Sequence, residues 1–496
     1  MSLRQEVLAR RAAEVAKQMA KRLEPCPDLR VQPWSTQRDT GVVVWLEGLV
    51  DADKLQEALL ALRDAGGARG RREIPHPGVA TQQVETLSAA VRAVLDGCAV
   101  IARDGASSAQ AWRLDRVPAR SVDRSENEPT LHGPQEAFIE RLSVNLALVR
   151  KRLKSPRLKI ETFMVGETSP CEIAILYEEG VVKSDLLCEV RRRISQIRVD
   201  YVADINEVRE FINDPRFSVF PTTEETERPD CVVAGLMEGR VAIIADGSPT
   251  CLMVPVTFAM NLSSPEDYYM HYSLALPLRL LRHLMFWSSV LLPALYVALL
   301  TYNQDLLPTP LLVSVAAQHS GIPFPTVIEA LGMMVAFEAL REAGTRLPRA
   351  VGQSVSIVGT LVIGDAAVRA GLVSPGMVII VSATGVASFT LPALGLVQAA
   401  RLLQFPFVLA AGLFGLYGVL MLGIALLGRM ASLRSFGVPY LAPIAPTFIR
   451  DMKDVIIRAP WWMMQGRPRQ FQPVKRDRVP KHPARKQSPR WRWRPW

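Results

Sequence analysis

Between Leu284 and Leu427 charged residues are sparse, and several apolar runs are long enough to cross a lipid bilayer. A hydrocarbon core of about 30 Å is spanned by roughly 20 apolar residues of helix. Candidate spans of this kind run over 283–301, 351–370, 374–399 and 405–427. The sequence therefore predicts a multi-span α-helical transmembrane domain over 276–448, preceded by a soluble region and followed by a basic tail over 449–496.

The stretch 308–349 differs from these spans because prolines interrupt it and polar groups lie within it. Pro308, Pro310, Pro323 and Pro325 break it, and Gln318 and His319 are polar. Irregular backbone at membrane depth is tolerated only where protein or water surrounds it. We expect either a re-entrant pair of half-helices, with four crossings in all, or two short protein-enclosed helices, with six. Both even numbers put the two termini on the cytoplasmic side, as the basic residues that flank the domain also indicate.

Ionisable groups in and beside this stretch, with one polar amide, are the candidates for a functional site. The pore or gating candidates are Glu329, Glu338, Arg341, Glu342, Gln353 and Asp365. Charges in a membrane segment are costly and usually face a cavity, a pore or one another. An ion pathway is one interpretation, and a cluster of salt bridges that holds the helices in register is the other. For Asp365 the spacing to Arg369 favours a structural ion pair.

The soluble half contains an internal duplication. The apolar run 41–48, followed by a helical pattern over 53–62, is matched by the run 173–180 and a helical pattern over 185–193. Each copy ends in a second matched run, 97–105 and 239–247, that closes on Asp-Gly, a common hairpin turn. The fold class is thus mixed, with two similar cytoplasmic α/β subdomains over 1–130 and 131–275. The second subdomain begins with a linker and a helix over 135–153.

The ends of the chain and its composition set further expectations. The first 23 residues have no apolar core, which predicts no cleavable signal and a cytoplasmic N-terminal half. From Arg450 onward there are fourteen Lys and Arg, which account for the net charge of +10, and this tail is expected to be disordered. Because it follows a membrane span, we expect it to bind anionic lipid rather than nucleic acid. The six cysteines form no C-x-x-C pair, so no metal site is predicted.

Catalytic motifs are absent from the sequence: there is no P-loop, no H-E-x-x-H and no nucleophile elbow. We therefore expect neither an enzyme nor a cofactor.

Several runs, in order, resemble the A subunits of GerA-type spore germinant receptors. The matching runs include Ser264-Pro-Glu-Asp-Tyr-Tyr269, Val327-Ile-Glu-Ala330, Phe337-Glu-Ala-Leu-Arg-Glu-Ala-Gly344, Gly352-Gln-Ser-Val-Ser-Ile-Val-Gly359 and Ser435-Phe-Gly-Val-Pro-Tyr440. The resemblance implies a subunit in the spore inner membrane, with both termini in the cytoplasm or spore core. It also implies a ring-shaped homo-oligomer that releases monovalent cations, together with a transporter-like B subunit and a lipoprotein C subunit.

The chain departs from the family pattern at a few positions. Met334 stands where the family often has an acid, Asp365 where it usually has Gln, and 348–350 lacks a Pro-x-Pro turn. A branch with the same architecture, the SpoVA-associated F-type proteins, is the alternative assignment.

Three functional hypotheses follow, in this order. The first is a cation channel subunit of a germinant receptor, and the second is a non-conducting scaffold that couples germination proteins. The third is a secondary transporter, which would need inverted repeats in the membrane half that the sequence does not contain. A further possibility is that the two α/β subdomains enclose the nutrient at their junction.

Overall fold

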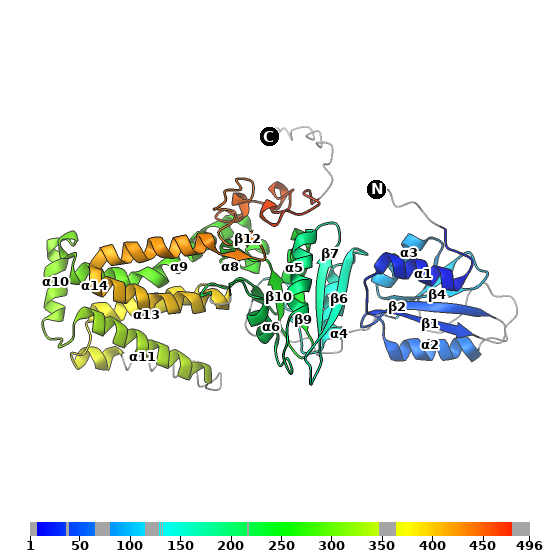
Figure 1. Cartoon of the computed structure of the whole chain (residues 1–496), viewed down its shortest axis with the longest axis horizontal. Coiled ribbons are helices and arrows are strands. Elements are labelled where there is room, and N and C mark those ends of the chain that lie inside the picture. Colours follow the sequence, from blue (N-terminus) through cyan, green and yellow to red (C-terminus); the bar gives the residue numbers. More distant parts are fainter. Residues whose placement is uncertain are drawn as a thin grey trace, which may run out of the picture.

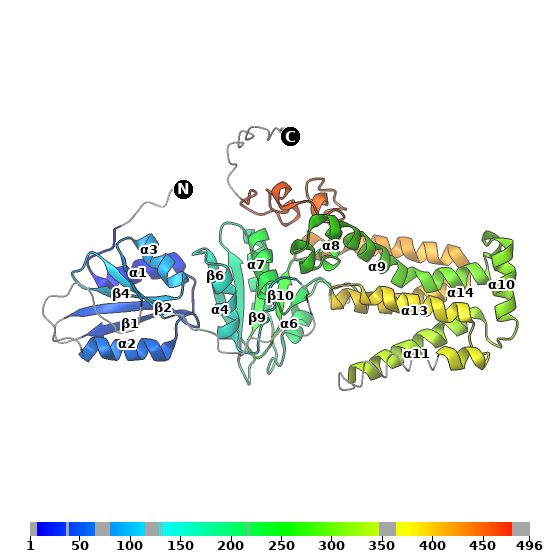
Figure 2. The ribbon, with the colours of Figure 1, turned by 180° about the vertical axis from the view of Figure 1, so that it is seen from behind.

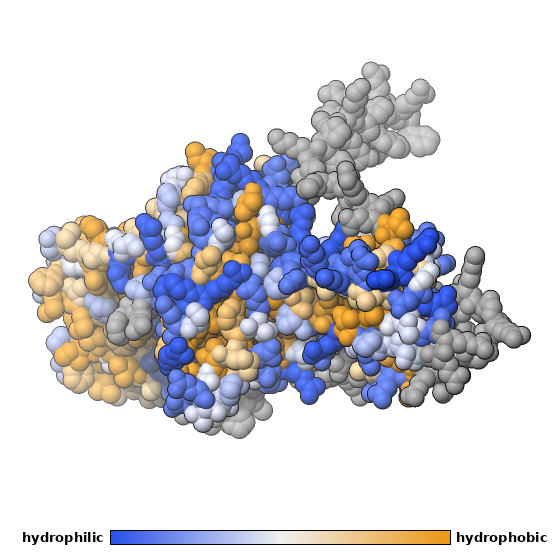
Figure 3. Space-filling model, turned by 45° about the vertical axis from the view of Figure 1, so that its right-hand side comes forward, coloured by the Kyte–Doolittle hydropathy of each residue, from blue (hydrophilic) through white to orange (hydrophobic). Residues whose placement is uncertain are grey.

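The computed structural model describes residues 7–35, 39–64, 80–114, 128, 130, 132–215, 218–346 and 364–478. The molecule is elongated, with two α/β units and a helical part arranged in line (Figure 1). The view from behind shows the same order, with the second α/β unit in the middle (Figure 2). Apolar residues gather over the helical end of the molecule (Figure 3).

The first α/β unit is one antiparallel sheet covered by helices on both faces. Its elements are α1 (Ala12–Leu23), β1 (Leu29–Ser35), β2 (Thr40–Leu46), α2 (Ala52–Asp64), β3 (Thr81–Val84), α3 (Leu87–Leu95), β4 (Cys98–Arg103) and β5 (Ala109–Arg113). The strand order is β1-β2-β4-β5-β3. Because side chains alternate along a strand, Val44 and Val100 face α1 and α3, whereas Val43 and Ile101 face α2.

The second α/β unit repeats this arrangement. Its elements are α4 (Leu142–Arg152), β6 (Leu158–Val165), β7 (Cys171–Glu178), α5 (Ser184–Ser195), α6 (Ile205–Ile212), β8 (Glu224–Thr226), α7 (Pro229–Glu238), β9 (Val241–Ala245) and β10 (Cys251–Val254). The strand order is β6-β7-β9-β10-β8, so the five strands follow the same topology as β1-β2-β4-β5-β3 in the first unit. The first pair of matched sequence runs forms β2 and β7, and the second pair forms β4 and β9. Among the described elements of the second unit, α6 alone has no counterpart in the first.

The two Asp-Gly pairs close hairpins, and each also caps a helix. Asp104 Oδ1 accepts a hydrogen bond from Ala12 N at the start of α1, at 2.8 Å. Asp246 Oδ1 accepts one from Leu142 N at the start of α4, at 2.9 Å. A carboxylate there satisfies an amide that has no partner within the helix and interacts favourably with the helix dipole. These aspartates are thus structural in both copies.

The predicted helix over 135–153 begins later than expected, at Leu142. Asn145 holds the preceding chain in a non-helical path, because its side chain accepts from Ile139 N at 2.9 Å and donates to Ile139 O at 2.6 Å. Side chains of this type compete with helical hydrogen bonds for the backbone.

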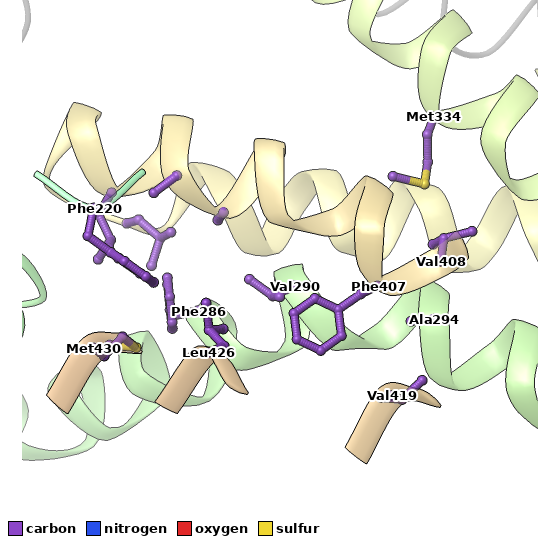
Figure 4. Close-up of a cluster of buried hydrophobic side chains, with 14 of the residues drawn as sticks. Phe220, Phe286, Val290, Ala294, Met334, Phe407, Val408, Val419, Leu426 and Met430 are labelled. Atoms are coloured by element: carbon purple, nitrogen blue, oxygen red, sulfur yellow. The ribbon is translucent and has the colours of Figure 1, made fainter. Parts of the chain in front are cut away.

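The helical part consists of α9 (Tyr272–Thr301), α10 (Thr309–His319), α11 (Thr326–Arg346), a helical stretch over 364–369, α13 (Pro375–Phe389) and α14 (Leu394–Ser432). Within the described residues, α9 and α14 are long and apolar enough to cross a membrane. Phe286, Val290 and Ala294 of α9 form a buried core with Phe407 and Val408 of α14 (Figure 4). The predicted span 351–370 lies mostly outside the described residues.

The predicted single span over 405–427 is wrong, because the chain reverses within α14. Gly415 has φ 58° and ψ −145°, a conformation that interrupts the helix. As a result Val419 lies at the same end of the buried cluster as Val408 and Ala294, and Met430 lies at the opposite end with Phe220 (Figure 4). The turn packs against the end of α9, where Asn303 Oδ1 accepts from Leu416 N at 3.0 Å. An apolar composition conceals such a turn, since no polar residue marks it.

The broken stretch 308–349 divides at Pro323 and Pro325 into α10 and α11. Helix α11 runs back along the other helices, whereas α10 lies across their far end (Figures 1 and 2). No residue of α10 is buried within this single chain.

Short elements connect the helical part to the second α/β unit. They are α8 (Phe258–Asn261), η1 (Pro265–Tyr268), β11 (Arg434–Ser435), β12 (Val438–Pro439), η3 (Met452–Asp454), η4 (Trp461–Met463) and η5 (Arg469–Phe471). One more short element, η2 (Gln304–Leu306), lies between α9 and α10. The sequence predicts disorder from residue 449, but residues 449–478 fold back onto the second α/β unit. There Arg467 Nε donates to Met237 O at 2.6 Å and Arg478 Nη2 to Glu238 Oε1 at 2.5 Å.

Candidate functional site

Glu329, at the start of α11, is a buried carboxylate surrounded by three other helices. Its Oε1 accepts hydrogen bonds from Ser374 N and Ser374 Oγ, both at 2.5 Å. Its Oε2 makes no hydrogen bond to the described residues and lies 3.4 Å from His319 Nε2 of α10. The buried hydroxyl of Tyr296, on α9, likewise lacks a partner among the described residues.

The local sequence explains how Glu329 comes to this position. Pro325 ends the preceding irregular segment, and Glu329 N donates to Pro325 O in the first turn of α11. Ser374 is the N-cap of α13, with its Oγ accepting from Met377 N at 3.2 Å. The carboxylate therefore binds at a helix N-terminus, where backbone amides and the helix dipole favour negative charge. Gly376 leaves room beside it, since a Cβ there would lie 2.5 Å from the Tyr296 hydroxyl oxygen.

Glu338 lies further along α11 and is neutralised by two guanidinium groups. Arg401, on α14, donates from Nε to Glu338 Oε2 at 3.1 Å and forms a salt bridge with the same carboxylate. Arg341 Nη1 lies 3.5 Å from Glu338 Oε2, and its guanidinium packs over the rings of Phe337 and Phe389. These three side chains line a small space between α9, α11, α13 and α14. Their arrangement is that of an ion-pair cluster between helices.

The remaining candidates do not join these two sites. Glu342 is an exposed residue of α11. Asp365 is exposed and pairs with Arg369 at 2.9 Å, which is the i, i+4 ion pair that the sequence favours. Gln353 lies outside the described residues. The structure thus brings Glu338 and Arg341 together and places Glu329 separately, in the first turn of α11.

Two partners in these sites were missed from the sequence, Arg401 and Tyr296. Arg401 is the one charged residue between Arg369 and Arg429, and this isolation is the signal that marks it. Tyr296 gives no such signal, because a tyrosine in an apolar helix is common.

A third cluster fixes the start of α9. Asp267 is fully buried and accepts from Arg279 Nε at 3.1 Å and from Arg282 Nη2 at 2.5 Å. Arg279 also donates from Nη1 to the carbonyl oxygen of Asp454, at 2.8 Å, and Tyr268 donates to the carboxylate of Asp454 at 3.0 Å. The cluster thereby joins the second α/β unit, the first apolar helix and the C-terminal segment.

Next to this cluster is a cavity of about 340 Å³. Its walls come from α7, the loop 257–269 and the segment 450–478, not from the junction of the two α/β units. Thr257 Oγ1 and Gln470 Oε1 line it and make no hydrogen bond to the described residues. They leave hydrogen-bonding capacity for water or a small polar molecule. Within the described ranges, no three His, Cys, Asp or Glu side chains are placed to hold a metal ion.

Comparison with known proteins matches this chain to spore germination proteins. The sequence matches the Bacillus/Clostridium GerA spore germination protein family over residues 17–470. Spore germination protein KA of Bacillus subtilis is 40% identical over 433 residues, covering 86% of this chain and 80% of that protein. Uncharacterized membrane protein YfkQ of Bacillus subtilis is 41% identical over 434 residues, covering 86% of this chain and 85% of that protein.

A solved structure also aligns with part of the chain. The N-terminal domain of the A subunit of the Bacillus megaterium spore germinant receptor GerK3 is 23% identical, with a TM-score of 0.40. It covers 51% of this chain and 98% of that domain. The family match and the relatives over most of the sequence settle the assignment: the chain belongs to the GerA family of spore germination proteins.

Proposed function

We propose that this chain is the A subunit of a spore germinant receptor and that its oligomer is a membrane channel for monovalent cations. A transporter-like B subunit and a lipoprotein C subunit are its proposed partners. The family membership and the names of the relatives support the role in germination.

The observation that best supports a channel is Glu329. A buried carboxylate whose second oxygen accepts no hydrogen bond and lies 3.4 Å from a histidine nitrogen, His319 Nε2, is costly in an apolar helical domain unless a cation, a proton or water approaches it. Glu329 Oε2 and the Tyr296 hydroxyl both lack hydrogen-bond partners among the described residues. Four helices supply the groups around this point, so a small movement of α10 changes access to the carboxylate. We assign Glu329 to the permeation path or its gate.

We propose the spore inner membrane as the location, with both termini on the inner side. Helix α9 leaves the second α/β unit, and the end of α14 returns to it, where Ser435 Oγ donates to Thr222 O at 2.6 Å. A chain that enters and leaves the helical part on one side makes an even number of crossings. One relative is named a membrane protein, which agrees with this location.

The test replaces Glu329 by Gln in a spore-forming host that lacks its own copy of the protein. Spores with E329Q are expected to release monovalent cations more slowly after nutrient addition, with unchanged amounts of the protein. The matched control is D365N, which removes an exposed carboxylate from the same helical part. Wild-type release from E329Q spores would remove Glu329 from the permeation path.

A non-conducting scaffold is the second candidate, and the Glu338 cluster favours it. A carboxylate held between Arg401 and Arg341 is already neutralised, as expected of a group that joins helices. On this view E338Q lowers the amount of assembled protein and leaves the cation release per assembled complex unchanged. Slower release from normally assembled E338Q complexes would instead put Glu338 in the channel.

A further inference from the structure

The segment that follows the helical part exposes an unusual number of large apolar side chains. In residues 444–463, here called the interfacial segment, such side chains are 41–82% exposed; they are Ile444, Ile449, Ile457, Trp461, Trp462 and Met463. Isolated exposed apolar residues are normal, but six within twenty residues, two of them tryptophan, indicate a segment that binds another apolar phase.

The interfacial segment is fixed beside the first turns of α9. The ring centroids of Tyr268 and Trp461 are 5.8 Å apart, and those of Tyr272 and Trp462 are 5.9 Å apart. Trp461 Nε1 donates to Tyr268 O at 3.4 Å. Tyr272 begins α9, whose exposed Leu274 and Leu278 continue the apolar surface. The tryptophans thus lie where the apolar helix surface starts, the level at which Trp and Tyr concentrate in membrane proteins.

Positive charge accompanies this apolar surface. Arg429 and Arg434, at the end of α14, and Arg450, within the interfacial segment, are exposed. None of the three has a carboxylate partner among the residues that the structure describes. Cations beside interfacial aromatic side chains are the combination that attracts anionic headgroups.

We infer that the interfacial segment, together with Arg429 and Arg434, binds the headgroup layer of an anionic phospholipid membrane. Trp461 and Trp462 lie at the level of the upper acyl chains, and the arginines bind lipid phosphate. The contacts of Asp454 with the buried Arg279 connect this surface to α9. The inference rests on the membrane location that belongs to the proposed function, but it does not require ion conduction.

The first test measures which tryptophans touch lipid. Full-length protein is reconstituted into liposomes whose lipids carry bromine near the headgroup end of the acyl chains, which quenches nearby tryptophan fluorescence. The chain has nine tryptophans. In W461F/W462F the quenched fraction is expected to fall. In the control W34F/W45F, which removes tryptophans of the first α/β unit, it is expected to rise.

The opposite result is equally clear. A quenched fraction that rises in W461F/W462F, as in the control, means that the segment faces water or another protein. That outcome overturns the inference and leaves the channel proposal untouched.

The second test addresses the charge and does not depend on tryptophan. Addition of phosphatidylglycerol to phosphatidylcholine liposomes is expected to raise the melting temperature of the wild type, and R429Q/R434Q/R450Q is expected to lose most of that shift. K17Q/K21Q/R92Q, which removes three exposed cations from the first α/β unit, is expected to keep it. An equal shift in both triple variants would contradict binding of anionic lipid by this surface.

Discussion

Asp267 shows how a single carboxylate determines the position of the first apolar helix. It lies fully buried between Arg279 and Arg282, and Arg279 also binds Asp454. A buried ion pair is a weak source of net stability, yet removal of one partner is expensive because the other charge stays buried and unpaired. Here the loss of Asp267 would leave two guanidinium groups without their carboxylate.

The variant D267N is accordingly expected to destabilise the protein by about 3–5 kcal/mol. Thermal unfolding in detergent and the amount of protein in the membrane would both report the loss. D365N, which affects an exposed pair, should stay within about 0.5 kcal/mol of the wild type. Similar stability of the two variants would mean that the Asp267 cluster does not anchor α9.

Glu238, at the end of α7, gives the α/β region a pH dependence. Burial raises the pKa of Glu238 from 4.5 to about 7, although the nearby Arg478 opposes the shift. The folded state therefore holds this proton more tightly than the unfolded chain does. The contribution to stability is complete below pH 4.5 and is lost as the pH rises to about 7.

In E238Q the side chain cannot ionise, so the melting temperature should fall less over that pH range than in the wild type. Part of the fall in melting temperature with pH should persist in E238Q, because burial also raises the pKa of Glu128 to about 7. The exposed carboxylate of Glu57 offers a control, and E57Q should retain the full slope. If the melting temperature of E238Q fell with pH as steeply as that of the wild type, Glu238 would be ionised over this whole pH range in the folded protein.

Spacing in the sequence identified some of these residue contacts and not others. The Asp365–Arg369 pair and the Glu338–Arg341 contact follow from i+4 and i+3 spacing on one helix. The contact of Glu338 with Arg401 joins residues 63 positions apart on different helices. No periodicity predicts such a partner, because it depends on how the helices pack.

At the scale of elements, Gly415 decides the path of the last apolar stretch. Its backbone conformation is one that glycine alone adopts without strain. A Cβ at this position would also lie 2.8 Å from Tyr302 Cβ and 2.9 Å from Asn303 Oδ1. The reversal therefore depends on the absence of a side chain.

We predict that G415A lowers the amount of folded protein in the membrane and its melting temperature, since strain of about 1–3 kcal/mol adds to the steric clash. G423A is the matched control in the same helix, where a Cβ meets nothing within 4 Å. It should be neutral or slightly stabilising. Equal behaviour of the two variants would argue for a continuous helix through residue 415.

The sequence predicted strands better than apolar helices. The repeated strands β2, β7, β4 and β9 stand out because apolar runs end at glycine turns. In the helical part nearly every position is apolar, so turns are not marked by polar residues. Gly415 was consequently hidden inside a predicted span.

At the scale of the whole molecule, ion pairs join parts that are distant in sequence. Arg150 of α4 binds Asp28 of the first α/β unit through two hydrogen bonds of 2.5 and 2.8 Å. Lys159 donates to the backbone oxygens of Arg22 and Glu24 in the same unit. Arg150 thus fixes one α/β unit to the other.

We propose that the helical part conducts cations past Glu329, and ion flux through the purified protein tests this proposal most directly. The chain is reconstituted into liposomes with its partner subunits, and potassium release is followed for the wild type, E329Q and D365N. We predict release by the wild type and by D365N, and a several-fold slower rate for E329Q at equal protein content. Release by E329Q at the wild-type rate, or no release by the folded wild-type complex, would contradict this account.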